Sequence, residues 1–434
     1  MTNNIASDAT VSEETLSSNS IELLRFTTAG SVDDGKSTLI GRLLVDSQGL
    51  YEDQLDAARK IQSDRGGEGV DLASITDGLH AEQEQGITID VAYRYFSTPR
   101  RKFIIADTPG HEQYTRNMVT GASTADATII LIDARIGVRP QSRRHIYLAH
   151  LLGIKHIIVA VNKMDLVGYD EKVFNAIKEE FGGFCRDLGV VDLRFIPVSA
   201  LQGDMIAHRG DKFDWYHGET LLTTLETLVV HQRSQDSVLR FPVQLVNRPR
   251  QPEYHDFRGY MGRVESGIVN VGDEVIVLPG CHKTKVTEII SFDGPMQSAH
   301  AKQSVTLVLE DEIDISRGDM IVGTVNQPRI EKEIDAYLCW MSEEPMQAGA
   351  KYLIRHAART VKGQIKQLDY TVDINTLKHD QTPDSLGLNG IGRVKIRMQQ
   401  PLVVDDYDNV RETGGFIVID THSNNTVAAG MITQ

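Results

Sequence analysis

The chain has 434 residues, of which 41% are hydrophobic and 24% are charged, and its formal net charge is −15. This length exceeds what one hydrophobic core usually organises, so two or three globular domains are expected. The acidic balance argues against nucleic acid and anionic lipid as partners, because both attract clustered lysine and arginine.

The cysteines and the N-terminus bear on the cellular compartment. Cys185, Cys281 and Cys339 are far apart and show no CxxC or Cys/His spacing, so neither a zinc site nor a disulfide framework is predicted. Residues 1–20 are polar and rich in Ser and Thr, and we expect a disordered tail rather than a signal peptide. No apolar run approaches the ~20 residues that span a bilayer. A cytoplasmic protein without a membrane segment is expected.

Residues 21–237 alternate short apolar runs with segments of helical periodicity, which is typical of an α/β domain with a mostly parallel sheet. The runs expected to form buried strands are 23–30, 102–108, 127–134, 156–163 and 194–200. The segments expected to form helices are 37–46, 141–153, 169–181 and 218–230. A long insertion between 49 and 88 is expected to lead into a mobile loop.

The helical pattern stops after residue 237, and short apolar runs separated by turn residues follow. This pattern predicts two small antiparallel β-barrels, at 238–329 and 330–434. The predicted fold is therefore an α/β P-loop domain followed by two β-barrel domains.

The stretch GSVDDGKST, residues 30–38, fits G-x-x-x-x-G-K-[ST] and lies between a predicted strand and a predicted helix. In this context backbone N–H groups and the helix N-terminus bind phosphates. Lys36 is expected to reach the β- and γ-phosphates and Ser37 to bind Mg²⁺. A coincidental glycine-rich turn is the alternative, and the flanking elements disfavour it. The predicted phosphate-loop residues are Gly30, Asp33, Asp34, Gly35, Lys36, Ser37 and Thr38.

Three further strand ends predict that the nucleotide is GTP or GDP. Asp107-Thr-Pro-Gly110 supplies a carboxylate for Mg²⁺, through water, and an N–H for the γ-phosphate. In the stretch Asn162-Lys163-Met164-Asp165, the Asp165 carboxylate can accept hydrogen bonds from both N1–H and N2–H₂ of guanine. Adenine cannot make this match. Ser199, Ala200 and Leu201 follow, where a backbone N–H can meet guanine O6. An ATPase, or a relic that binds no nucleotide, is the alternative interpretation.

Two more residues are predicted to act at the γ-phosphate. Thr88, in Gly86-Ile-Thr88, is expected to bind Mg²⁺ when the γ-phosphate is present. His111 follows Gly110 directly, so it can position the attacking water as a catalytic residue beside Lys36. A surface or satisfied core histidine is the alternative for His111.

With these motifs in order, the chain resembles translation-factor GTPases of the elongation factor Tu and 1α class. Within that class it most closely resembles the GTPase subunit of bacterial sulfate adenylyltransferase, or ATP sulfurylase. The closer likeness lies first in GSVDDGKSTLIGRLL, which has Ser31 and Asp34 where elongation factor Tu has histidines. It lies also in Gln85, before GIT, at a position where elongation factor Tu has arginine. ADTPGHEQYTRNMVTGAS and TGGFIVIDTHSNNTVAAGMI complete the set.

This resemblance implies a GTP-hydrolysing subunit of a two-subunit enzyme of sulfate assimilation. A separate nucleotidyltransferase subunit makes adenosine 5′-phosphosulfate and pyrophosphate from ATP and sulfate, and GTP hydrolysis drives that uphill reaction. The implied partner is this small catalytic subunit, with a higher oligomer of heterodimers allowed. The resemblance also implies roles for Asp33, Lys36, Ser37, Thr88, Asp107, Gly110, His111, Asn162, Lys163, Asp165 and Ser199.

A translation elongation factor that binds aminoacyl-tRNA is the alternative function, and a scaffold with negligible turnover is a third. The net charge of −15 and the residue changes at Asp34 and Gln85 disfavour the tRNA carrier. No residue of this chain is assigned to ATP or sulfate.

Overall fold

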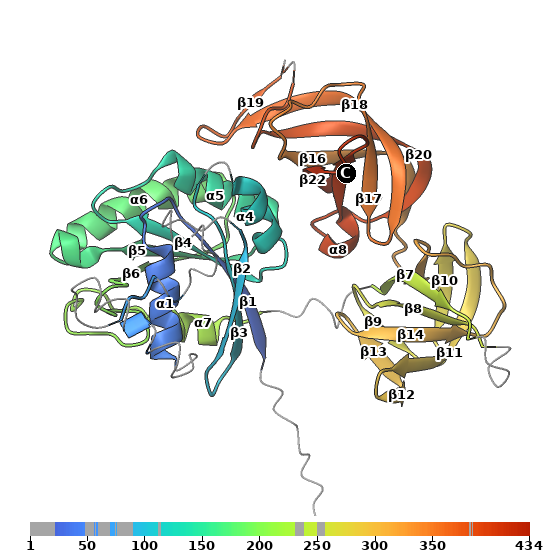
Figure 1. Cartoon of the computed structure of the whole chain (residues 1–434), viewed down its shortest axis with the longest axis horizontal. Coiled ribbons are helices and arrows are strands. Elements are labelled where there is room, and N and C mark those ends of the chain that lie inside the picture. The colour runs from blue at the N-terminus through green and yellow to red at the C-terminus, as the bar shows by residue number, and fades with distance from the viewer. Residues whose placement is uncertain are drawn as a thin grey trace, which may run out of the picture.

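A computed structural model describes residues 22–47, 56, 58–59, 70–73, 75, 90–111, 114–230, 238–249, 257–381, 383 and 385–434. An α/β domain lies on one side of the molecule and two barrels lie on the other (Figure 1). The predicted fold class, an α/β P-loop domain followed by two small β-barrels, is confirmed. The predicted tail and most of the insertion that ends at Thr88 lie outside the described residues.

The α/β domain is built on a six-stranded sheet of order β2-β3-β1-β4-β5-β6, parallel except for the edge strand β2. All five predicted strand runs form strands of this sheet. β4 has every residue buried, as expected for a strand covered on both faces. The strands are β1 (Leu23–Ala29), β2 (Ala92–Ser97), β3 (Lys102–Asp107), β4 (Ala127–Asp133), β5 (His156–Asn162) and β6 (Asp192–Pro197).

Helices cover this sheet because their apolar positions recur on one face. The helices are α1 (Lys36–Asp46), α4 (Thr115–Ala122), α5 (Pro140–Leu151), α6 (Glu171–Asp187) and α7 (Leu221–Thr227), with the 3-10 turn η2 (Met164–Val167). α7 is shorter than the predicted 218–230, because Leu228 leaves the helical region with ψ 120°. Val229 beyond it is exposed.

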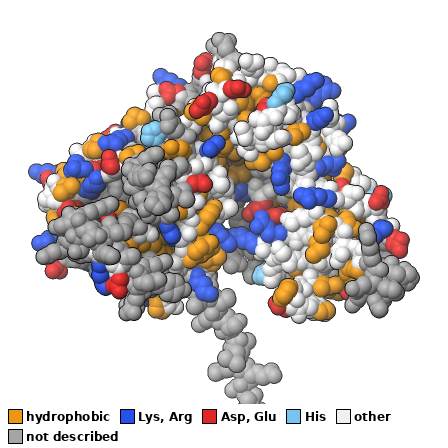
Figure 2. Space-filling model, in the orientation of Figure 1, with side chains coloured by type: hydrophobic (Ala, Val, Ile, Leu, Met, Phe, Trp, Pro, Cys, Tyr) orange, Lys and Arg blue, Asp and Glu red, His pale blue; other side chains and the backbone are white. Residues whose placement is uncertain are grey.

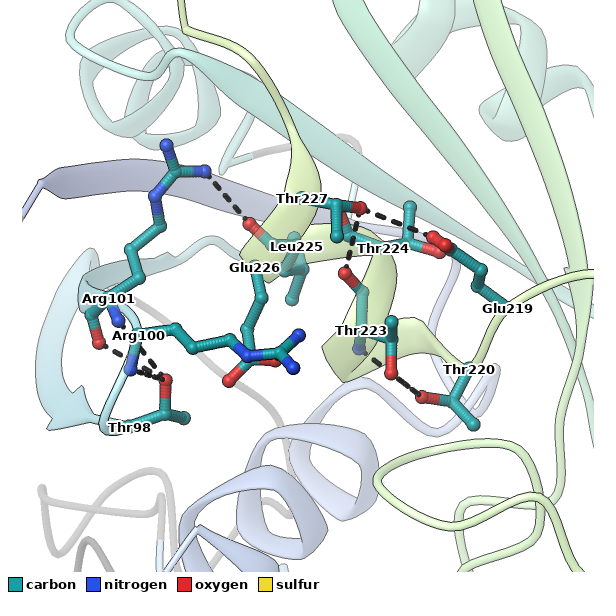
Figure 3. A network of polar contacts seen from close by, with 10 residues as sticks. All are labelled: Thr98, Arg100, Arg101, Glu219, Thr220, Thr223, Thr224, Leu225, Glu226 and Thr227. Carbon is teal, nitrogen blue, oxygen red and sulfur yellow. Dashed lines mark hydrogen bonds and ion pairs between the residues drawn. The ribbon is translucent and has the colours of Figure 1, made fainter.

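The turn between β2 and β3 holds the C-terminus of α7 (Figure 3). The nearly buried Arg101 guanidinium donates to the carbonyl oxygens of Leu225 at 3.1 Å and Leu228 at 2.6 Å. A cation that satisfies the last carbonyls of a helix also complements its dipole. The exposed Arg100 pairs with Glu226 at 3.5 Å beside it, a contact that contributes little.

The first barrel is a seven-stranded sheet closed by the pairing of β10 with β11. Its strands are β7 (Arg240–Asn247), β8 (Gly259–Arg263), β10 (Glu274–Leu278), β11 (His282–Ser291), β12 (Gly294–Met296), β14 (Ser304–Leu309) and β15 (Met320–Gly323). A separate pair, β9 (Ile268–Asn270) with β13 (Ser298–His300), lies beside it.

The second barrel is also seven-stranded and is closed by β17 with β18. Its elements are β16 (Arg329–Trp340), β17 (Lys351–His356), β18 (Arg359–Asp373), β19 (Lys378–Asp380), β20 (Ile391–Val404), α8 (Arg411–Gly414), β21 (Gly415–Asp420) and β22 (Thr426–Thr433). β16 begins next to the predicted boundary at 330; the domain boundaries themselves stay predictions.

The second barrel contacts the α/β domain around α8. Tyr407 donates its hydroxyl to the Leu152 carbonyl at 3.3 Å, and Arg411 donates to the Ala125 carbonyl at 3.4 Å. Leu152 follows the end of α5 and Ala125 follows the end of α4. Side chains of the second barrel therefore satisfy carbonyl groups at two helix ends. Among the described residues, no helix has the length and apolar character to cross a membrane. All three cysteines are free thiols.

Candidate nucleotide-binding site

The phosphate loop lies between β1 and α1, as the sequence predicts. Asp33 (φ 68°) and Gly35 (φ 92°) both adopt the left-handed region. This conformation turns successive backbone N–H groups inward to form an anion-binding nest at the start of α1. A side chain at Gly35 would lie 2.5 Å from the Asn162 amide nitrogen, so only glycine allows this approach.

Lys36 lies inside the loop and is 7% exposed. Its ammonium group donates to the carbonyl oxygens of Gly30 at 3.0 Å and Ser31 at 3.2 Å. Burial lowers the pKa of Lys36, while the charge of Asp107 opposes that shift. A buried cation whose hydrogen bonds go to carbonyls is suited to receive an anion in the loop.

The two adjacent acids of the loop have different surroundings. Asp33 is exposed, whereas Asp34 is 2% exposed and its carboxylate accepts from the Ser31 N–H at 2.6 Å. Burial raises the pKa of Asp34 to about 6, against the opposing Ser31 hydrogen bond and the Lys36 charge. Asp34 therefore closes the loop on itself, which is a structural role that the sequence alone did not reveal.

The predicted guanine-reading loops meet at the same sheet edge, and Asn162 connects them. Its amide donates to the Asp34 carbonyl at 2.8 Å and accepts from the Ala200 N–H at 3.0 Å. Asp165 accepts a hydrogen bond from the Ser199 hydroxyl at 2.7 Å, which fixes the orientation of its carboxylate. Asp165 is half-buried and lies in η2, the turn that follows β5.

Asp133 is a residue that the sequence analysis did not single out. It ends β4 beside Asn162 and is 1% exposed. Its carboxylate pairs with Lys163 at 3.0 Å and with Arg135 at 2.7 Å. Burial opposes its ionisation, but the hydrogen bonds from Arg135 and Lys163 outweigh burial and lower its pKa to about 2. Its position at the carboxyl end of a strand on the same edge was the available signal.

Arg42 is a second residue that no motif indicated. It lies on α1 and donates to the carbonyl oxygens of Ala200 at 3.2 Å and Leu201 at 2.6 Å. The Leu201 side chain is 62% exposed, so the backbone of this loop is what the structure holds in place. No local pattern announces a contact between residues so far apart in sequence.

A cavity of about 280 Å³ opens over the loop. Asp107 ends β3 and is buried, while Gly110 and the exposed His111 form the wall opposite the loop. A side chain at Gly110 would lie 2.3 Å from the Lys36 nitrogen. Among the described residues, the predicted site residues that line the cavity are Asp33, Gly35, Lys36, Ser37, Thr38, Gly110, His111 and Lys163.

The donor set fits a magnesium ion that is shared with phosphates. Ser37 lines the cavity, and the buried Asp107 ends β3 three residues before Gly110, which also lines it. Mg²⁺ in nucleotide sites takes one or two protein oxygens and completes its octahedron with phosphate and water. Thr88, the third predicted ligand, lies outside the described residues.

Family comparisons match all three parts of the chain. Residues 21–234 match the Elongation factor Tu GTP binding domain. Residues 260–322 match Elongation factor Tu domain 2, and residues 333–433 match the GTP-eEF1A C-terminal domain-like family.

Full-length relatives are similar across almost the whole chain. Sulfate adenylyltransferase subunit 1 of Cellvibrio japonicus (strain Ueda107) is 54% identical, over 95% of this chain and 87% of that protein. The subunit 1 of Shewanella oneidensis is 51% identical, over 94% of this chain and 85% of that protein. The bifunctional enzyme CysN/CysC of Mycobacterium tuberculosis (strain ATCC 25618 / H37Rv) is 54% identical, over 94% of this chain and 67% of that protein.

Proposed function

This chain belongs to the family of sulfate adenylyltransferase subunit 1, with a GTP-binding domain of the elongation factor Tu type, and we propose that it hydrolyses GTP to drive sulfate activation. A separate catalytic subunit forms adenosine 5′-phosphosulfate and pyrophosphate from ATP and sulfate. The phosphosulfate anhydride is a high-energy bond, so its formation is uphill without a coupled reaction. GTP hydrolysis on this chain supplies that coupling in the cytoplasm.

The observation that carries this proposal is the assembly of three separate loops by Asn162. Its side chain connects the phosphate loop at Asp34 with the Ser199–Leu201 loop at Ala200, and Asp165 lies three residues beyond it. One nucleotide can therefore contact the phosphate-binding and base-reading groups together. Bidentate pairing of Asp165 with N1–H and N2–H₂ selects guanine over adenine.

The chain's own residues account for the chemistry of hydrolysis. Lys36 offsets the charge that develops on the transferred phosphoryl group, and the loop N–H groups hold it in place. His111, on the cavity wall, orients water for in-line attack, so no protein nucleophile is needed. Ser37, Asp107 and Thr88 would hold Mg²⁺, Asp107 through water, and the ion would neutralise phosphate oxygens when bound.

Coupling requires two states of this chain that differ in their contacts with the catalytic subunit. The elements attached to the γ-phosphate side of the site are the candidates for that difference. β3 ends at Asp107 and α4 begins at Thr115, so both adjoin Gly110 and His111.

The test is the rate of GTP hydrolysis by this chain with the catalytic subunit, with and without ATP and sulfate. The expected result is a rise in the rate of GTP hydrolysis that requires the catalytic subunit, ATP and sulfate together, with adenosine 5′-phosphosulfate formed in parallel. A rate that ignores the subunit and its substrates would contradict the proposal. His111→Ala should then lower turnover far more than it lowers nucleotide affinity.

A further inference from the structure

One face of the α/β sheet is open at its β2 edge. Tyr93 and Tyr95 of β2 are 43% and 66% exposed, whereas β4 in the centre of the sheet is buried throughout. Hydrophobic side chains gather over β2 and β3, beside the hollow that separates the α/β domain from the barrels (Figure 2). Because mostly parallel sheets are normally covered on both faces, this open stretch is an exception within the domain.

The strand register arranges the open stretch as a groove. Tyr95 lies opposite Ile104, and Ile104 lies opposite Arg25, so the three side chains form one row on the same face. The groove has a volume of about 240 Å³. Its far wall is the C-terminal end of α4 and the residues after it, including Thr124 and Ala125.

Arg25 gives the groove a positive charge. Its backbone N–H bonds to the Asp126 carboxylate at 2.9 Å. Its half-buried guanidinium makes no ion pair with any described residue. A groove with tyrosines, aliphatic side chains and a guanidinium that pairs with no described carboxylate is complementary to an apolar side chain flanked by a carboxylate.

The floor and the far wall of the groove both lead to the nucleotide site. The floor is β3, which ends at Asp107, and the far wall is α4, which begins four residues after His111. Arg411 of the second barrel also donates to the Ala125 carbonyl in this wall. A protein seated in the groove would therefore contact elements whose ends adjoin the γ-phosphate, and its affinity would depend on the bound nucleotide.

We propose that this groove is the docking site of the separate catalytic subunit, which seats an apolar side chain between Tyr95 and α4 and a carboxylate on Arg25. The assignment rests on the proposed function, because coupled hydrolysis requires a contact that senses the nucleotide. Tyrosine and arginine are also, with tryptophan, enriched among the residues that dominate binding energy at interfaces.

The test measures the affinity of the catalytic subunit for full-length variants of this chain loaded with a non-hydrolysable GTP analogue. Tyr95→Asp and Arg25→Glu are each expected to weaken binding by at least about tenfold. Both should keep the GTP affinity and the unstimulated GTPase rate, which show that the chain is folded. The matched control is Val191→Asp, which changes a 98% exposed side chain before β6, at the opposite sheet edge, and should leave binding unchanged.

The outcomes separate this assignment from the function on which it rests. Groove variants that bind as tightly as wild type overturn the docking site and leave the proposed function standing. Groove variants that lose self-association while keeping their affinity for the catalytic subunit assign the groove to a second copy, which also overturns it. A wild-type chain that fails to bind the catalytic subunit overturns both.

Discussion

Arg240 and Asp405 form a two-pronged ion pair that joins the two barrels. Nε and Nη2 of Arg240 in β7 donate to the two carboxylate oxygens of Asp405 at 2.8 Å each. Arg240 is 2% exposed, and its other donors reach the carbonyl oxygens of Leu239 and Asn326. The Thr413 hydroxyl donates to Asp405 as well. All three guanidinium nitrogens of Arg240 thus donate hydrogen bonds, and the pair fixes the orientation of one barrel on the other.

Removing one partner of this pair should destabilise the barrels strongly. Arg240→Met leaves Asp405 as a buried carboxylate without its cation, and we expect a loss of about 3 kcal/mol in the free energy of unfolding. The measurement is urea unfolding of the full chain, followed by circular dichroism. Arg263→Met is the control, because its pair with Glu265 is 47% exposed on the arginine side and should contribute at most about 1 kcal/mol. Equal urea midpoints for Arg240→Met and Arg263→Met would contradict a larger stabilising effect of the buried pair.

Asp34 should make the nucleotide-free chain less stable as pH rises. Its folded-state pKa is raised from 3.8 to about 6, so the folded chain binds this proton more tightly than the unfolded chain does. Stability from this group is therefore present below about pH 4 and is lost as pH rises through about 6. This difference in pKa corresponds to a loss of about 3 kcal/mol in the free energy of unfolding at neutral pH.

The variant Asp34→Asn should remove that dependence while keeping an oxygen for the Ser31 N–H. We expect it to unfold at a higher temperature than wild type at pH 7 and at nearly the same temperature at pH 4. Thermal unfolding of both nucleotide-free chains between pH 4 and pH 7 gives the comparison. A difference that is constant across this range would show that ionisation of Asp34 is not its cause.

The parts of this molecule that follow from local pattern were predictable, and the parts that depend on tertiary contact were not. The phosphate loop is predictable because its glycines and Lys36 have the motif's spacing and lie between an apolar run and a helical pattern. Buried strands were found because an apolar run of this length suits a sheet covered on both faces. The pairs Arg240–Asp405 and Asp133–Lys163 join separate elements, and no sequence period relates their members.

The length of α7 and the closure of the Asp34 carboxylate on Ser31 were missed for a related reason. Helical periodicity continues through Val229, but the side chain of this residue is 63% exposed and the helix ends before it. An acid next to a phosphate loop is expected to face solvent, and only the fold shows that the Asp34 side chain is buried. The roles assigned to Thr88, His111 and the other site residues stay predictions.

Asp133 should support nucleotide affinity through Lys163. Asp133→Asn removes the negative charge that pairs with the Lys163 ammonium group, so we expect GTP and GDP to bind about tenfold more weakly. The rate at saturating GTP should change little, because no group at the γ-phosphate is altered. The control is Asp192→Asn, which changes a carboxylate that pairs with His156 at 2.6 Å at the start of β6. A fall in turnover with unchanged affinity would show that Lys163 is positioned by other contacts.

Asp165 should decide which base the site accepts. Asp165→Asn presents an amide donor where the carboxylate accepted, so it should bind xanthosine triphosphate, which carries an oxygen in place of the guanine amino group. We expect affinity for GTP to fall roughly a hundredfold, because two charge-assisted hydrogen bonds are lost. Ser199 can still donate to the asparagine oxygen, as it donates to Asp165 at 2.7 Å, so the loop should keep its shape.

Asp170→Asn, which alters the N-terminal cap of α6, is the control and should leave base preference unchanged. Competition binding of the two triphosphates measures the preference, and an Asp165→Asn chain that still favours GTP would show that another group reads the base.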